Sequence, residues 1–463
     1  MVDRAATGSR SDATSGQAHA AVRAAPLAHL GPGLLAVLLV AVLLAAMVIY
    51  ARMLELRYVY ALAPLFFTQK MQGVALQQAA LEQPDLLLLY GSSELQTGAE
   101  YQKSEFPYHL FATRPTGFDV FPVGQNNMTS LTILQRLAAL GPELRGRQVV
   151  ISLSPGFFIN FSMVAPSAYA FNFSHLQADE LVYNSPLSLQ LKQAIARRML
   201  QYPKTLDHAP LLRFSLEQLA DGSPMSRWRY YAVWPIGELE TLVLQLQDHW
   251  EMLSLISCPA NLTSSTQHLP IEGKSCGPAL NPTIQPVPAT INWPAFEQHA
   301  QQVVRKNNTS NPFGFDDYNW RHRIHSWAAT AENARSDKQF RQSLDQGVEW
   351  VDMDLMLRTL QELGARPLVL SMPMPGTFYQ YLGVSAQSRM LYYQKFRTLA
   401  SRYPVAERDF ADHDLDTDFI LDASNHLSAK GWAYYDQVLD AFYHDRLPAL
   451  AADQKELAFY ANR

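Results

Sequence analysis

An apolar run near the N-terminus constrains this chain more than any other feature of its sequence. Residues 34–50 read LLAVLLVAVLLAAMVIY and contain no charged side chain. Together with Gly33, the run approaches the about 20 residues that a helix needs to cross the hydrocarbon core of a bilayer. We therefore predict one transmembrane helix over residues 31–52, which contacts lipid through residues 33–50.

A cleaved signal peptide is the competing interpretation of this run. A signal peptide normally has a shorter apolar core and a small-x-small cleavage site close behind it. The first such site, Ala61-Leu62-Ala63, lies beyond Arg52 and Arg57, which favours an uncleaved anchor. Arginines flank both ends, so the positive-inside rule gives only a weak preference. A short tail before a large domain favours a cytoplasmic tail and an extracytoplasmic, periplasmic domain at the inner cell membrane.

The composition of the chain excludes several classes of protein. Hydrophobic residues make up 48% and charged residues 17%, which is typical of a globular body with a membrane segment. The formal net charge of -5 provides no basic excess to neutralise phosphates, so we expect no nucleic-acid partner.

The two cysteines, Cys258 and Cys276, lie in a stretch rich in turn-forming residues. Neither belongs to a CxxC motif or a Cys/His cluster, so no metal site is expected. In an oxidising compartment they form one disulfide; otherwise they are two unpaired thiols.

Short apolar runs alternate with helical patterns in two parts of the sequence, and this alternation predicts an α/β fold with a parallel sheet flanked by helices. The expected elements are strands at 85–90, 118–123, 149–153, 367–370 and 405–410, and helices at 130–140, 351–363 and 388–402.

Between residues 161 and 345 the pattern changes to helical spacing with long polar connections, which predicts a mainly helical insertion. The helical patterns in it cover residues 187–199, 211–219 and 236–255. The predicted organisation is a disordered tail (1–30), the anchor (31–52), two parts of the α/β domain (53–160 and 346–445) around the insertion (161–345), and a C-terminal tail (446–463).

The sequence Gly91-Ser92-Ser93-Glu94-Leu95 follows the first predicted strand directly. Ligands of open parallel sheets bind at the carboxyl ends of the strands. A serine on a tight turn there can present its hydroxyl outward, and the N–H groups of a following helix favour a developing negative charge. Taken alone, such a tripeptide is more often an ordinary turn.

A second candidate segment near the C-terminus reads Asp422-Ala423-Ser424-Asn425-His426. A serine hydroxyl needs a base to become a nucleophile, and a histidine oriented by a carboxylate meets that need. Taken alone, this segment is better explained as a surface loop, because the sequence has 13 histidines.

The turn after the second predicted strand, Gly124-Gln125-Asn126-Asn127, offers a glycine N–H and asparagine amides as donors to an oxyanion. The alternative is an ordinary polar turn without a catalytic role, because glycine and asparagine are common turn residues.

The order of these segments favours one kind of chemistry. A serine after the first strand, with Asp and His together on a C-terminal loop, is the order of SGNH (GDSL-like) hydrolases. The α/β-hydrolases instead carry a G-x-S-x-G motif in the middle of their sequence, and the present sequence lacks that motif. We therefore predict a serine acyltransferase or esterase without an organic cofactor. In it His426 removes the proton of a serine in the Gly91-Ser92-Ser93 turn, and donors near Gly124, Asn126 and Asn127 hold the oxyanion.

Several ordered motifs resemble the DltD family. Tyr90-Gly91-Ser92-Ser93-Glu94-Leu95 looks like its signature, and Ile151-Ser152-Leu153-Ser154-Pro155-Gly156-Phe157-Phe158 is similar to its SPQWF-type strand end. Further matches in order are Gln201-Tyr202-Pro203, Phe313-Gly314-Phe315 and Lys430-Gly431-Trp432.

The resemblance implies an N-terminal anchor, an extracytoplasmic SGNH-like domain and a role in the D-alanylation of teichoic acids. It implies as partners a membrane-bound O-acyltransferase (DltB-like), a D-alanyl carrier protein and a cell-envelope polymer. It also implies that Ser93 is the nucleophile, with Ser92 in the place of the Asp of a GDS block, His426 as the base and Asp422 as the acid.

Two departures from the family pattern keep alternatives open. Asp422 lies four residues before His426, where the family has a spacing of three, and Ala423 holds the usual place. The turn after Gly124 carries Gln, Asn and Asn where Gram-positive members are glycine-rich, which favours a different acyl acceptor. The rival functions are an O-acetyl transferase or esterase of an envelope polysaccharide and a non-catalytic scaffold for the acyltransferase and the carrier.

Overall fold

The computed structural model describes residues 30–66, 68–96, 98, 100–160, 165–257, 290–328 and 336–447. The chain divides into two compact units, residues 1–47 and 48–463. Cys258 and Cys276 lie outside the described residues, so the disulfide stays a prediction.

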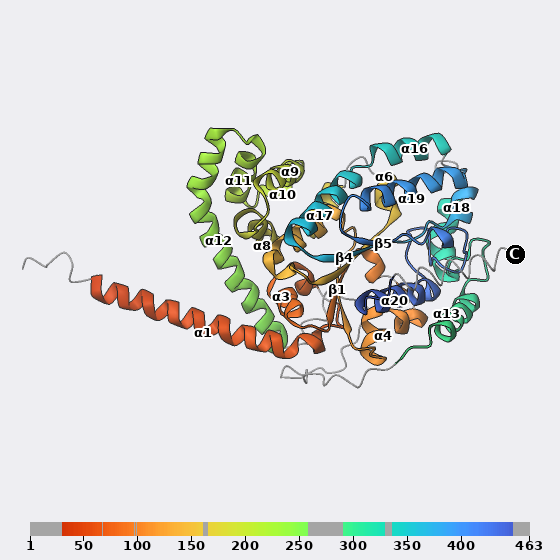
Figure 1. The fold of residues 1–463 in the computed structure, drawn as a ribbon, viewed down its shortest axis with the longest axis horizontal. Helices are drawn as coiled ribbons and strands as arrows, with labels where there is room; N and C mark the ends of the chain where they lie inside the picture. The colour runs from red at the N-terminus through yellow and green to blue at the C-terminus, as the bar shows by residue number, and fades with distance from the viewer. Residues whose placement is uncertain are drawn as a thin grey trace, which may run out of the picture. The chain divides into compact units, whose positions relative to one another are not determined.

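A five-stranded parallel sheet forms the centre of the large unit, in the order β2-β1-β3-β4-β5 (Figure 1). This confirms the predicted α/β class. The strands are β1 (Leu86–Gly91), β2 (Asp119–Gly124), β3 (Gln148–Leu153), β4 (Arg366–Ser371) and β5 (Ala406–Arg408). The last strand is shorter than predicted, because Phe410 adopts a left-handed conformation (φ 49°) that ends the extended segment.

Both faces of the sheet are covered, so alternate residues of one strand enter different hydrophobic clusters. In β1, Leu88 and Tyr90 face one cluster, while Leu87 and Leu89 face the other. The helices of the first cluster include α3 (Ala75–Glu82), α5 (Ser130–Leu140), α17 (Glu349–Leu363) and α19 (Ala386–Ala400). Those of the second include α4 (Pro107–Thr113), α13 (Trp293–Asn307) and α20 (Ala429–Tyr443). This double cover explains why the strands read as unbroken apolar runs.

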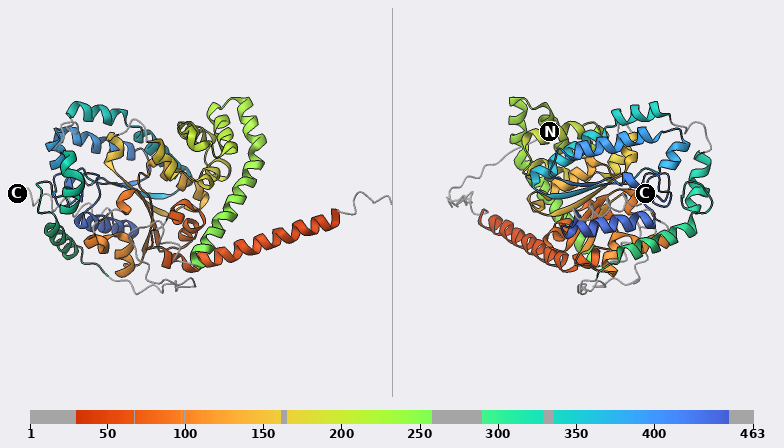
Figure 2. Two further views of the ribbon diagram at one scale, coloured as in Figure 1. Left: turned by 180° about the vertical axis from the view of Figure 1, so that it is seen from behind. Right: turned by 45° about the vertical axis from the view of Figure 1, so that its right-hand side comes forward.

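A group of helices follows β3 along the chain and packs beside the sheet (Figure 2). Its members are α8 (His175–Asp179), η4 (Glu180–Asn184), α9 (Leu189–Met199), α10 (Pro203–Leu206), α11 (Pro210–Asp221) and α12 (Pro224–Ser257). Helix α12 begins earlier than the predicted pattern at residue 236, and it continues through Pro235, whose side chain is exposed.

The remaining elements are short, and several adjoin the loops that form the site. They are α2 (Thr68–Gln72), η1 (Ser93–Leu95), η2 (Glu100–Glu105), η3 (Gly141–Leu144), α6 (Pro155–Asn160), α7 (Pro166–Asn172), α14 (Asp317–Asn319), η6 (Trp320–Ile324), α15 (His325–Ala328), α16 (Asp337–Gln346), α18 (Gly376–Tyr381) and η8 (Ala411–His413).

The apolar run lies in helix α1 (Leu30–Leu62), within which Gly31–Leu62 is a candidate membrane span with a mean hydropathy of 3.0. The helix continues past the predicted end of the anchor at residue 52. Its last turns bury Ala51, Glu55, Val59 and Leu62 inside the large unit. These turns therefore belong to the core of the large unit as well as to the helix.

A buried ion pair joins α9, in the group of helices after β3, to α17, which packs on the sheet. It can be used to test how much such contacts stabilise the protein. Arg198 donates to Asp352 through Nε at 2.6 Å and Nη2 at 2.8 Å. Replacing Arg198 by Met leaves the carboxylate of Asp352 buried without its partner, and we expect the free energy of unfolding to fall by about 3–5 kcal/mol.

The matched control is Arg213→Met, which removes an exposed arginine paired with Asp207 and should cost less than about 1 kcal/mol. Urea unfolding of the full-length protein in detergent, followed by circular dichroism, measures both values. Equal losses for the two variants would contradict the account.

Candidate functional site

The carboxyl end of β1 positions the serine motif. Gly91 pairs with Gly124 across the β1–β2 ladder, and a Cβ at Gly124 would lie 2.8 Å from the carbonyl oxygen of Gly91. Only glycine permits this approach of the two strand ends. The backbone then turns through Ser92, and Ser93 begins the short helix η1.

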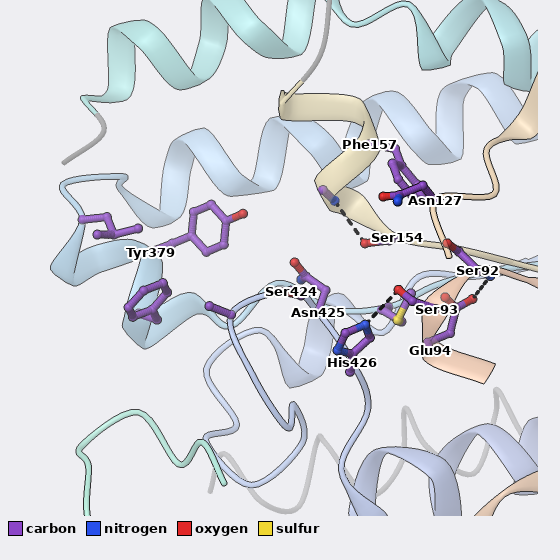
Figure 3. A pocket seen from close by; sticks show the side chains of 15 residues that line it. Ser92, Ser93, Glu94, Asn127, Ser154, Phe157, Tyr379, Ser424, Asn425 and His426 are labelled. Atoms are coloured by element: carbon purple, nitrogen blue, oxygen red, sulfur yellow. Dashed lines mark hydrogen bonds between the residues drawn. The ribbon is translucent and has the colours of Figure 1, made fainter. Parts of the chain in front are cut away.

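Ser93 is connected by hydrogen bonds to the two predicted partners from the C-terminal loop. Its Oγ is 2.9 Å from Nε2 of His426 (Figure 3). Nδ1 of His426 is 2.8 Å from Oδ2 of Asp422. Both loop side chains are buried, with 8% of His426 and 4% of Asp422 exposed. The structure thus brings the serine motif and the C-terminal loop together, although Ser93 and His426 are separated by 333 positions in the sequence.

The loop accommodates the four-residue spacing through one left-handed residue. Asn425 has a φ of 66°, a conformation that asparagine tolerates better than most residues. Oδ1 of Asp422 accepts hydrogen bonds from the backbone N–H of Ser424 at 2.9 Å and of His426 at 3.4 Å. The loop is closed by a bridge between Ile420 and Leu427. The extra residue is absorbed in this turn, so Asp422 still reaches the imidazole.

Electrostatics favour an ionised Asp422 beside a basic His426. Burial acts to raise the pKa of Asp422, but the charge and hydrogen bonds of His426 and the N–H of Ser424 outweigh it and lower the pKa. Burial acts to lower the pKa of His426, but the charge and hydrogen bond of Asp422, with the charge of Glu94, outweigh it and raise the pKa. The imidazole is therefore a stronger base than free histidine.

Ser92 and Glu94 hold the two strand-end turns together. Oγ of Ser92 accepts a hydrogen bond from the N–H of Met128 at 3.1 Å and donates to the carbonyl of Gln125 at 3.4 Å. The N–H of Ser92 donates to Oε1 of Glu94 at 2.9 Å. Burial raises the pKa of Glu94, although these hydrogen bonds and His426 oppose the rise.

A cavity of about 290 Å³ opens beside Ser93 and His426. Asn127, from the predicted oxyanion turn, lines it. Gly124 and Asn126 do not: Gly124 is engaged against Gly91 in the sheet, and the carbonyl of Asn126 accepts a hydrogen bond from Asn172. Asn127 has a left-handed φ of 61°.

The rest of the cavity wall was not among the predicted site residues. It is mostly apolar or small and includes Ser154, Gly156, Phe157, Met372, Phe378, Tyr379, Leu382, Ala423, Ser424 and Asn425. Phe157 and Ser154 belong to the ISLSPGFF motif, which gave a signal for this position. No sequence pattern identified the side chains from α18, because their position depends on tertiary packing.

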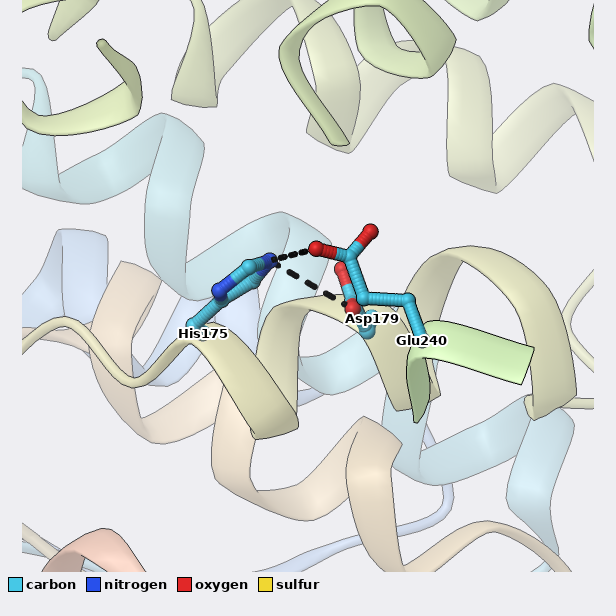
Figure 4. Close-up of side chains that lie close together, drawn as sticks. All are labelled: His175, Asp179 and Glu240. Atoms are coloured by element: carbon cyan, nitrogen blue, oxygen red, sulfur yellow. Dashed lines mark ion pairs between the residues drawn. The ribbon is translucent and has the colours of Figure 1, made fainter. Parts of the chain in front are cut away.

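A second group of titratable side chains joins α8 to α12 (Figure 4). Nε2 of His175 is 3.4 Å from Oδ2 of Asp179 and 3.6 Å from Oε1 of Glu240. Burial acts to lower the pKa of His175, but the two carboxylates outweigh it and raise the pKa. The closeness of His175 to both carboxylates explains the group as a polar link between α8 and α12. The expected absence of a metal site stays a prediction.

Comparison with known proteins decides the family. A model of the DltD protein family matches residues 64–444, which is most of the chain. The chain belongs to the DltD family. Protein DltD of Bacillus subtilis (strain 168) is 26% identical over 383 residues, covering 83% of this chain and 88% of that protein. Protein DltD of Staphylococcus aureus (strain NCTC 8325 / PS 47) is 23% identical over 369 residues, covering 80% and 84%. The DltD resemblance inferred from the motifs is confirmed.

The left-handed residue in the loop of this DltD-family protein yields a prediction. Asn425→Gly loses the amide hydrogen bond to Pro373 but adopts a positive φ freely, so it should be more stable than Asn425→Ala. Asn425→Ala should lower the free energy of unfolding by about 1–2 kcal/mol, because a Cβ disfavours this conformation. Thermal unfolding of the full-length protein in detergent compares the two. Equal losses of unfolding free energy in the two variants would show that the amide of Asn425 contributes more to stability than its backbone conformation does. This amide donates to the carbonyl of Pro373.

Proposed function

We propose that this protein transfers an acyl group through an acyl-serine on Ser93. The observation that carries the proposal is the continuous series of hydrogen bonds from Ser93 through His426 to Asp422 at the edge of a cavity. These are the residue types, and the contacts, with which serine hydrolases activate their nucleophile. In its order along the sequence this arrangement corresponds to an SGNH-type enzyme.

The proposed reaction has two halves with the same base. Oγ of Ser93 attacks the carbonyl carbon of an ester or thioester while Nε2 of His426 takes the hydroxyl proton. The tetrahedral intermediate collapses, and the alcohol or thiol leaves with that proton. A hydroxyl of the acceptor then attacks the acyl-serine, gives its proton to His426, and Ser93 recovers a proton as it leaves. Asp422 stabilises the imidazolium in both halves.

The developing oxyanion needs donors inside the cavity. We assign this role to the N–H of Ser93, at the start of η1, and to the amide of Asn127. Gly124 and Asn126 then contribute indirectly, by setting the turn that carries Asn127. Ser92 fixes this turn against the serine motif through its bonds to Met128 and Gln125.

Membership in the DltD family supports a role in the D-alanylation of teichoic acids, together with other proteins of that pathway. On that ground we assign D-alanine as the acyl group, and the cavity of about 290 Å³ is large enough to hold it. A membrane-bound O-acyltransferase and a D-alanyl carrier protein are the proposed partners. We propose that the chemistry occurs on the extracytoplasmic side, in a domain formed by residues 53–160 and 346–445 around the insertion 161–345.

An activated serine is tested with a fluorophosphonate on the full-length protein in detergent. We expect an adduct on the peptide that contains Ser93 and its loss in Ser93→Ala and His426→Ala. The matched control is Ser424→Ala, which removes another hydroxyl from the cavity wall and should keep the adduct. Peptide mass spectrometry locates the label. An undiminished adduct in Ser93→Ala, or none in the folded wild type, would refute the proposal.

The pH dependence of labelling tests the electrostatics. Only neutral His426 can take the proton, so the rate should rise with pH, with a midpoint above the ordinary histidine value of 6.5 because Asp422 raises the pKa. Asp422→Asn removes that charge, so the midpoint should move down while the rate at high pH falls by about 10,000-fold. Labelling rates measured in quenched reactions, from mildly acidic to basic pH, give the midpoint and the rate at high pH. An unchanged midpoint in the variant would contradict the assigned role.

A further inference from the structure

Helix α12 presents an apolar stripe to the outside of the large unit. Figures 1 and 2 show it as the outermost helix on its side of that unit. Trp228 is 68% exposed, Leu239 60% and Trp250 64%. The stripe, at steps of three or four residues, consists of Trp228, Tyr231, Pro235, Leu239, Leu242, Leu246 and Trp250. This spacing keeps all of them on one face of a helix.

The opposite face of α12 holds the helix to the rest of the unit, and Tyr230, Met252 and Leu255 enter the core there. Gly237, Thr241 and Asp248 are buried there. The carboxylate of Asp248 accepts hydrogen bonds from the N–H groups of Val74 at 2.9 Å and Ala75 at 2.8 Å, at the start of α3. The helix therefore cannot turn its apolar face inward without breaking these contacts. A surface helix of an aqueous protein instead carries charged or polar residues on its outward face.

The stripe is larger than the scattered apolar residues of an ordinary surface. From Trp228 to Trp250 it extends for about 33 Å at 1.5 Å per residue. Continuous exposed patches of this extent mark contacts with proteins or membranes rather than with water. The charged residues Arg227, Arg229 and Glu238 lie at the sides of the stripe and not within it.

The C-terminal part of α12 contacts α1 just beyond the apolar run. Nδ1 of His249 is 2.8 Å from Oε1 of Glu55, whose side chain is buried. Glu55 follows Tyr50, the last residue of the run, by five residues along a continuous helix, a rise of about 7.5 Å. The headgroup layer on each side of the hydrocarbon core is of similar thickness, about 5–8 Å. This contact therefore places the end of α12 at the level of the lipid headgroups.

The side chains of the stripe also match that environment. Tryptophan and tyrosine favour the boundary between headgroups and acyl chains, and the stripe carries Trp228, Tyr231 and Trp250 on its exposed side. Arg227 and Arg229 flank its first turn, where long basic side chains can reach the headgroups.

We infer that α12 lies in the headgroup region of the bilayer that α1 enters, with its apolar stripe against the acyl chains. The large unit then has two attachments to the membrane, one through α1 and one along α12. Two attachments restrict the rotation of the large unit relative to the membrane. The inference is independent of the chemistry assigned to Ser93.

Photo-crosslinking from single positions tests this inference in the full-length protein. A diazirine analogue of leucine is placed at Leu239, and the protein is reconstituted in vesicles of phosphatidylethanolamine and phosphatidylglycerol. The matched control is Leu415, a leucine of similar exposure (57%) that lies far from α12 in the sequence. After irradiation, mass spectrometry counts lipid adducts on each peptide. We expect the lipid adduct at position 239 to exceed that at 415 severalfold.

Two results would overturn the inference. Equal lipid yields at the two positions would show that the stripe has no special contact with the bilayer. Crosslinks from position 239 to a second copy of the protein, without lipid adducts, would assign the stripe to a protein interface instead. The analogue keeps the size and polarity of leucine, so an unfolded variant is not expected, and an unchanged thermal transition checks this.

Discussion

The parallel direction of the strands is the constraint on which the candidate site depends. Because all five strands run the same way, their carboxyl ends share one edge of the sheet, and the site is assembled at that edge. Ser93 follows β1, Asn127 follows β2, Ser154 follows β3 and Met372 follows β4. Each of these strands thus supplies one part of the cavity wall, and the C-terminal loop adds the base and the acid. The close approach of Gly91 and Gly124 sets the spacing of the first two of these turns.

The charges of the site follow from burial combined with specific pairing. A buried carboxylate or imidazole alone would lose its charge, because a low-dielectric environment disfavours ions. The contact between Asp422 and His426, with the N–H groups around Asp422, reverses that tendency for both groups. The turn at Asn425 makes the contact possible at a spacing of four residues. Local backbone conformation and the electrostatics of the proposed base are therefore linked.

Local sequence patterns were sufficient for the sheet and for the residues around Ser93 and His426, but not for the whole site. A strand buried on both faces is an uninterrupted apolar run, so β1 to β4 were predictable, and the residue order around them indicated the serine and its partners. The turn proposed to hold the oxyanion was only partly predictable: of Gly124, Asn126 and Asn127, only Asn127 lines the cavity, and no sequence pattern specifies which residue does. Tyr379 and Phe378 reach the wall through the packing of α18, which is a property of the tertiary structure. The start of α12 before Pro235 was missed because a proline normally favours a helix boundary.

Detection of the acyl-enzyme itself shows whether Ser93 carries the acyl group. The full-length protein in detergent is incubated with a D-alanyl thioester, quenched in acid and digested, and the peptide masses are compared with those of an untreated sample. The account predicts that the peptide containing Ser93 gains the mass of one alanyl group, and that excess hydroxyl acceptor removes it. Transfer of alanine to the acceptor without any acylated Ser93 peptide, and with full rate in Ser93→Ala, would contradict it.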